Sequence, residues 1–140
     1  MSRAVEVERV DFVSVPTRDP AQARRFYGEL LGLYESTTPD DAFPEFETSN
    51  VTLGVWQPEV VGREFVPSAG VALRVADVAE TRRALEEAGV EFEGETLDTG
   101  VCHMAFCTDF DGNGVIVHRR YAPPRPHGTS HAEGRDPVES

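Results

Sequence analysis

The sequence predicts an α+β fold of two tandem βαβββ modules, at about residues 7–58 and 70–121. Each half contains a short run of alternating apolar residues, an aspartate, a helix that stops at a glycine, and further strands. The two aspartates, Asp19 and Asp77, lie 58 residues apart (77 − 19 = 58), and the paired arginines that follow keep this offset. Because one module exposes a sheet face that it cannot cover alone, we expect the two copies to form a curved mixed sheet with the helices outside.

Two amphipathic helices are predicted, over residues 19–31 and 78–88. Asp19 and Asp77 stand at their N-caps, and a glutamine or glutamate follows three residues later, as in a capping box. Gly32 and Gly89 follow the two helices, where a left-handed C-cap is favoured. The sequence therefore delimits both helices at both ends.

The strands are predicted from short runs of apolar and β-branched residues. They cover residues 7–15, 42–48 and 51–57 in the first module and 71–75, 91–95, 101–108 and 115–121 in the second. Pro44 places the 42–48 strand at an edge, since proline cannot donate to a strand ladder. The DFDGNG sequence at 109–114 predicts a hairpin turn. Residues 122–140 are poor in apolar side chains and predict a flexible tail that follows a domain of residues 1–121.

Composition and charge exclude several classes of function. The formal net charge of −12 argues against nucleic-acid binding, because nucleic-acid-binding proteins gather Lys and Arg on one face. Apolar runs are too short to span a bilayer, and the first ten residues lack the apolar centre of a secretory signal, so we expect a cytoplasmic protein. Residues 35–48 and 86–98 contain acids and no bases, which indicates either a solvated surface or an acidic rim that attracts a cationic ligand.

The D-x-x-x-A-x-x-F-Y-x-x-L-L-G-L arrangement at residues 19–33, together with the DFDGNG turn, resembles the vicinal oxygen chelate superfamily. This superfamily includes glyoxalase I, extradiol dioxygenases and bleomycin resistance proteins. The similarity covers residues 7 to about 121 and implies the glyoxalase/bleomycin resistance fold. Its members isomerise, epimerise, cleave rings, open epoxides or bind drugs, so the resemblance is specific for the fold and weak for the function.

The resemblance also implies where a metal would bind. Enzymes of the superfamily hold a divalent metal through His, Gln or Glu ligands on the first and last strands of each module. The matching positions in this sequence are Phe12, Gly54, Gly70 and Ile116. None of these residues offers a side-chain donor atom, whereas a cation needs three or more oxygen or nitrogen donors. We therefore expect neither a metal nor another cofactor.

Strand alternation, fixed by these four positions, predicts the lining of the concave face. The predicted ligand-binding residues are Phe12, Ser14, Trp56, Arg74, Met104, Phe106, Ile116, His118 and Arg120. The apolar and aromatic members would hold a planar organic ligand, with the arginines and the histidine as polar anchors. The alternative is that the same rings simply fill a closed core.

The function that this resemblance implies most concretely is metal-independent binding of a small organic molecule, as in sequestration of an aromatic or cationic antibiotic. The expected form is a homodimer without nucleic-acid or membrane partners. The alternative is a lyase or isomerase of the glyoxalase kind, or a dioxygenase-like enzyme, with displaced metal ligands. Such an enzyme would use His118 as general acid or base, or Cys102 as a nucleophile. No nucleophile motif surrounds Cys102, so no catalytic residue is assigned. A third interpretation is a structural or regulatory relative with a filled cavity.

Overall fold

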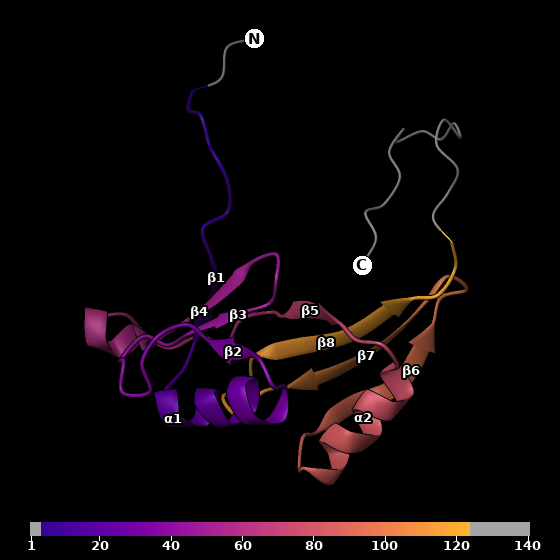
Figure 1. The fold of residues 1–140 in the computed structure, drawn as a ribbon. Coiled ribbons are helices and arrows are strands. Elements are labelled where there is room, and N and C mark those ends of the chain that lie inside the picture. The colour runs from indigo at the N-terminus through magenta and orange to yellow at the C-terminus, as the bar shows by residue number, and fades with distance from the viewer. Residues whose placement is uncertain (1–3, 124–140) are drawn as a thin grey trace. The chain divides into compact units, whose positions relative to one another are not determined.

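Each half of the chain is a four-stranded mixed sheet with a helix packed on one face (Figure 1). The computed structural model describes residues 4–123, and the chain divides into unit 1 and unit 2 between Ser68 and Ala69. The predicted tail, from residue 124 onward, lies outside the described residues. The predicted α+β class, with strands and helices in two repeated modules, is confirmed.

The two sheets have the same topology. Unit 1 contains β1 (Val13–Pro16), β2 (Tyr34–Glu35), β3 (Glu45–Glu47) and β4 (Thr52–Trp56) in the order β1-β4-β3-β2. Unit 2 contains β5 (Val71–Arg74), β6 (Phe92–Asp98), β7 (Cys102–Thr108) and β8 (Gly114–Arg120) in the order β5-β8-β7-β6. In both sheets the first strand runs parallel to the last, and the remaining neighbours are antiparallel.

The helices begin and end where the capping residues predict. Asp19 accepts a hydrogen bond from the Ala21 N–H at 3.0 Å, and Asp77 accepts one from the Glu80 N–H at 3.0 Å. These bonds satisfy backbone donors that have no partner within the helix. Gly89 follows the second helix with φ +96, a conformation that favours glycine. The second helix, α2 (Val78–Glu87), is a regular α-helix.

The first helix differs from the continuous α-helix that its periodicity predicts. A short α1 (Pro20–Ala23) passes into a π-helical stretch, η1 (Arg24–Leu30), in which the Leu31 N–H reaches back five residues to the Phe26 carbonyl at 3.0 Å. Hydrophobic spacing does not distinguish the two forms over so few turns, which is why the sequence does not reveal the wider helix.

The core of each unit lies between its helix and its sheet. In unit 1, the rings of Phe26 and Tyr27 meet edge to face at 4.9 Å, and Tyr27 lies against Phe46 of β3; all three residues have 1% exposure or less. In unit 2, Leu85 of α2 is buried together with alternate residues of β7 and β8. The opposite face of each sheet carries the side chains of the other parity.

Two strand predictions need correction, and one short strand was not predicted. The strand predicted over residues 7–15 begins only at Val13, where pairing with β4 starts, and Val7 and Val10 are exposed. The strand predicted at an edge is β3, which is paired on both sides because β2, which was not predicted, adds to it. Pro44 lies just before β3, so its missing N–H costs no ladder bond, and its carbonyl accepts from Val55 at 2.9 Å.

The DFDGNG sequence forms the predicted turn between β7 and β8. The buried Asp109 carboxylate accepts hydrogen bonds from the Asp111 N–H at 2.8 Å and from the Asn113 N–H at 2.9 Å through one oxygen. Its other oxygen accepts from the Asn113 amide at 2.8 Å. Both oxygens of this carboxylate are therefore used to hold the turn.

Candidate ligand-binding site

The face of the unit 1 sheet opposite the helix carries the first part of the candidate site. Strand register places Ser14 of β1 and Glu45 of β3 on either side of Gly54 of β4. The ring of Phe12 lies over Gly54: a Cβ atom there would stand 2.8 Å from the Phe12 Cδ1. Gly54 therefore leaves room for the aromatic ring of Phe12, a residue that is 54% exposed.

Trp56 is oriented by a hydrogen bond across the sheet. Its indole Nε1–H donates to the Ser14 hydroxyl at 2.9 Å, although the two residues are far apart in the sequence. Because an indole has a single donor, this bond satisfies the polar edge of the ring. What the partly buried Trp56 offers to a ligand is its apolar surface.

These residues border an apolar cavity of about 420 Å³, which we call the unit 1 cavity. Its lining includes Phe12, Ser14, Phe43, Glu45, Gly54 and Trp56. Phe12, Ser14 and Trp56 were predicted from strand parity, whereas Phe43 and Glu45 were not predicted as ligand contacts. Their only signals in the sequence are an aromatic residue beside Pro44 and an acid within the base-free run 35–48.

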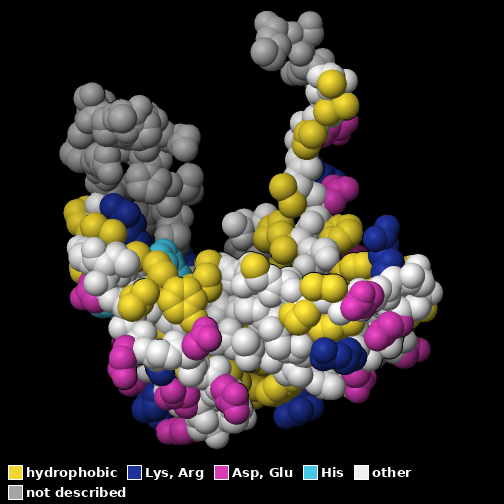
Figure 2. All heavy atoms as spheres, turned by 180° about the vertical axis from the view of Figure 1, so that it is seen from behind, with side chains coloured by type: hydrophobic (Ala, Val, Ile, Leu, Met, Phe, Trp, Pro, Cys, Tyr) yellow, Lys and Arg dark blue, Asp and Glu magenta, His cyan; other side chains and the backbone are white. Residues whose placement is uncertain are grey.

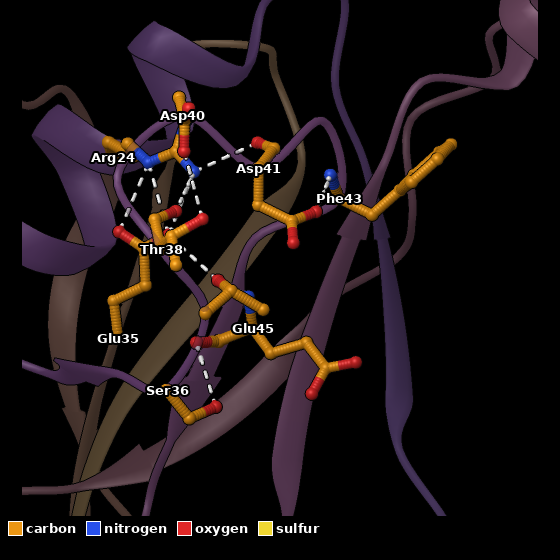
Figure 3. Close-up of polar contacts among 9 residues, drawn as sticks. Arg24, Glu35, Ser36, Thr38, Asp40, Asp41, Phe43 and Glu45 are labelled. Carbon is orange, nitrogen blue, oxygen red and sulfur yellow. Dashed lines mark hydrogen bonds and ion pairs between the residues drawn. The ribbon is translucent and has the colours of Figure 1, made fainter.

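Phe43 and Glu45 are held in place by a cluster of polar contacts around Arg24 (Figure 3). The Arg24 guanidinium binds the Glu35 carboxylate with Nε–Oε1 and Nη2–Oε2 distances of 3.0 and 2.8 Å. The same Nη2 donates to the carbonyl of Asp41 at 2.9 Å, and the Asp41 carboxylate accepts from the Phe43 N–H at 2.9 Å. In Figure 3, the Phe43 ring and the Glu45 carboxylate both point away from this cluster.

The Arg24–Glu35 pair is partly buried, with about a fifth of each side chain exposed. The hydrogen bond from Arg24, joined by one from Thr37, lowers the pKa of Glu35 below its usual 4.5, and burial opposes the change. The Glu35 hydrogen bond likewise raises the pKa of Arg24, so that the guanidinium stays charged. The pair thus ties the loop before β3 to the first helix at neutral pH.

The contribution of the Arg24–Glu35 pair to the free energy of unfolding depends on pH. Because the folded-state pKa of Glu35 is lowered, its contribution is complete above pH 4.5 and is lost as the pH falls below 4.5 through the folded-state value. We expect Arg24→Gln to lower the free energy of unfolding by about 2 kcal/mol at pH 7, with the difference from the wild type shrinking below pH 4.5. Urea unfolding at a series of pH values measures this. Glu35→Gln should remove the same pH-dependent part, and a difference that stays constant down to strong acid would contradict the assignment.

The remaining predicted ligand contacts lie together on the corresponding face of the unit 2 sheet. Ile116 of β8 is paired with Ala72 of β5 and with Phe106 of β7. In the next row, His118 is paired with Arg74 on one side and with Met104 on the other. The strand parity predicted for β7 is therefore correct.

Two polar residues of unit 2 have other partners. Arg120, predicted as an anchor for a ligand, donates from Nε and Nη2 to the carbonyls of Ala122 and Pro123, each at 3.1 Å. His103 lies on the other face from His118, since it is paired with Arg119, and it contacts the Asp98 carboxylate at 3.4 Å. Two histidines on adjacent strands can approach each other, but His103 and His118 lie on opposite faces of the sheet and do not form a pair.

Both cysteines are buried free thiols. Burial raises the pKa of the Cys107 thiol to about 11, and the carboxylate of Asp109 adds to the rise. The Cys102 sulfur lies 3.2 Å from the Thr99 hydroxyl. A thiol kept protonated at neutral pH is a poor nucleophile, so Cys107 does not suggest covalent chemistry.

Acidic side chains recur across the visible surface, with fewer basic ones among them (Figure 2), as the net charge of −12 requires. Within residues 4–123, no helix is both long and apolar enough to cross a bilayer. The charge distribution and the apolar cavity are consistent with a site for a small molecule.

A family model of the Glyoxalase/Bleomycin resistance protein/Dioxygenase superfamily matches residues 9–117. The chain belongs to this superfamily. No curated protein matches the sequence significantly. The superfamily identified from the repeat and the turn is thus confirmed over most of the chain.

Solved structures of the superfamily have the same fold. A lactoylglutathione lyase from Agrobacterium tumefaciens matches with a TM-score of 0.68 at 17% identity, over 81% of this chain and 94% of its own. A superfamily member from Sphaerobacter thermophilus matches with a TM-score of 0.66 at 19% identity, over 80% of this chain and 97% of its own. A glyoxalase/bleomycin resistance protein/dioxygenase from Nocardioides matches with a TM-score of 0.67 at 18% identity, over 91% of this chain and 93% of its own. At such identities the likeness is one of fold.

The residues at the positions that the resemblance assigns to metal ligands do not fit a metal. Ser14 and Ala72 are at equivalent positions in the 58-residue repeat. Ser14 pairs with Gly54 and Ala72 pairs with Ile116, so Gly54 and Ile116 are also equivalent positions in the two units. In unit 1 the hydrocarbon ring of Phe12 covers Gly54. In unit 2 the positions hold Gly70 and Ile116, which again lack side-chain donors. Across residues 4–123, no group of three or more His, Cys, Asp and Glu side chains is placed to hold a metal ion.

Proposed function

We propose that this protein binds a small aromatic or apolar molecule without a divalent metal, in the manner of a sequestering protein for an antibiotic, and that it does so as a homodimer. The observation that carries the proposal is the Phe12 ring packed over Gly54. It replaces two positions of the superfamily's metal-binding set with an aromatic surface. Binding of this kind needs shape and apolar contact, and it needs no reactive group.

The unit 1 cavity supports the proposal through its size and lining. A volume of about 420 Å³ lies within the range of small-molecule sites. Phe12 and Phe43 are 54% and 41% exposed, so a ligand would remove aromatic surface from water. Trp56 is fixed by Ser14 before any ligand arrives, which limits the entropy lost on binding.

One arrangement in unit 2 favours a second candidate, acid–base catalysis of the lyase or isomerase type. His118 and Arg74 are partners in strand register and belong to the same face. An imidazole beside a guanidinium can move a proton next to a developing negative charge. This candidate differs from sequestration because it requires turnover.

The proposal predicts saturable quenching of Trp56, the single tryptophan, by members of a library of planar aromatic compounds. Phe12→Leu should weaken the tightest of these ligands by about twofold to tenfold, because it removes one aromatic contact. Phe65→Leu, at a ring that lies under Arg18 and not at the cavity, is the matched control and should leave affinity unchanged.

Elemental analysis of protein purified without a chelator completes this test. We expect no stoichiometric Zn, Ni, Mn or Fe, and one metal ion per chain would contradict the proposal. A flat titration across the whole library would favour a filled core. A turnover of any library compound that disappears in His118→Ala would favour the enzyme.

A further inference from the structure

We propose that the unit 1 cavity selects an organic cation: an aromatic or apolar molecule that carries a quaternary or substituted ammonium group. The inference rests on the proposed function and names the ligand class of that site. Its basis is that three aromatic residues and one carboxylate line the same cavity, whereas its lining includes no basic residue.

The aromatic surfaces come from three separate segments. Phe12 precedes β1, Phe43 precedes β3 and Trp56 ends β4, and all three line the cavity. The face of an aromatic ring carries partial negative charge and attracts a cation that lies within about 6 Å of it. Since the Trp56 N–H is already bound to Ser14, the indole has no further donor for a neutral or anionic ligand.

Glu45 is the acid of this region whose carboxylate has no partner among the described residues. Glu35 is bound by Arg24 and Thr37, and Glu47 accepts from Ser36 at 2.7 Å and from Thr52 at 2.6 Å. Glu45 uses only backbone groups, which bind Ser36 and Thr37, and its exposed carboxylate is left at the cavity. Within residues 4–123, a carboxylate therefore lies beside the rings without an ion-pair partner from the protein.

The charges along the chain favour the same ligand class. No lysine, arginine or histidine occurs from residue 26 to residue 62, the stretch that supplies Phe43, Glu45, Gly54 and Trp56. Ser14 is the one cavity residue named above that retains a side-chain hydrogen to donate. An anionic ligand would thus meet a carboxylate and no cation, whereas an ammonium group would meet both the carboxylate and the ring faces.

The test compares two probes of the same shape, phenyltrimethylammonium and tert-butylbenzene, of which only the first is charged. Trp56 fluorescence and calorimetry should give a dissociation constant at least about fivefold lower for the cation. Glu45→Gln should remove most of this preference and leave the affinity for tert-butylbenzene unchanged. Higher ionic strength should weaken only the cation.

Glu59→Gln is the matched control, because Glu59 is an exposed acid outside the cavity and the substitution changes the net charge equally. It should leave both affinities as they are. Equal binding of the two probes, or a Glu45→Gln variant that keeps the preference, overturns the cation assignment while the proposed binding function stands. If neither probe binds but a planar compound of the library does, the cation assignment also falls alone. If no compound of any kind perturbs Trp56, both proposals fall.

Discussion

Replacing Gly114 with alanine is expected to lower the free energy of unfolding by about 3 kcal/mol, through overpacking of two backbone segments. Gly114 begins β8, and a Cβ atom there would overlap the carbonyl oxygen of Ala69 and lie 3.0 Å from its carbon. The obstacle is backbone, which cannot move aside as the end of a side chain can. Urea unfolding followed by circular dichroism measures the loss.

Gly62→Ala is the matched control for this substitution. Gly62 has φ +78, and a Cβ atom there would meet nothing within 4 Å, so alanine introduces backbone strain and no clash. We expect it to cost about 1 kcal/mol. A Gly114→Ala variant that is no less stable than Gly62→Ala would show that residue 69 does not approach β8 closely enough to exclude a methyl group.

Replacing Asp109 with alanine is expected to destabilise the protein by a similar amount, about 3 kcal/mol. The substitution leaves two backbone N–H groups and the Asn113 amide without the acceptors that they use in a buried turn. The loss of a partner costs more than the net worth of the bond, because the remaining groups stay out of water. Thermal and urea unfolding should agree on the direction.

Asp109→Asn and added Ca²⁺ test whether the Asp109 carboxylate acts through these hydrogen bonds or by binding a cation. Asparagine keeps one acceptor oxygen and the size of the side chain, so its destabilisation should be roughly half that of alanine. Added Ca²⁺ should stabilise neither the wild type nor the variants, because both oxygens of Asp109 already accept from protein donors. Stabilisation of the wild type by Ca²⁺ would contradict this account of the turn.

The sequence predicts those parts of the fold that depend on local patterns. Capping residues fix the helix ends, and the 58-residue repeat fixes the equivalence of the two units. The two-residue strand β2 has no such pattern, because it is defined only by its pairing with β3, a segment that lies further along the sequence. Without β2, the strand that follows Pro44 reads as an edge. The π-helix likewise has no local pattern; its Gly28 packs closely on Phe46, whose ring would lie 3.3 Å from a Cβ atom at that position.

The candidate site, like the fold, is predicted from the sequence only in part. Strand parity correctly places Ser14 and Trp56 on one face of unit 1, and Ile116 and His118 on one face of unit 2. It says nothing of Phe43, because the position of this residue depends on contacts from Arg24 to the carbonyls of Thr38 and Asp41, whereas Glu45 is placed by its pairing with Gly54. The contacts from Arg24 cross 14 and 17 residues of sequence. Such long-range bonds cannot be predicted from the sequence, because every residue type has the backbone carbonyl that accepts them.

The Arg24 cluster also bears on ligand preference under the proposed binding function. Arg24 belongs to the helical side of the sheet, yet it fixes the loop whose end presents Phe43 to the cavity. Under the proposed binding function, a substitution at Arg24 would therefore alter which ligands bind without removing a direct contact with them. A survey restricted to the residues that line the cavity would therefore miss the effect of Arg24.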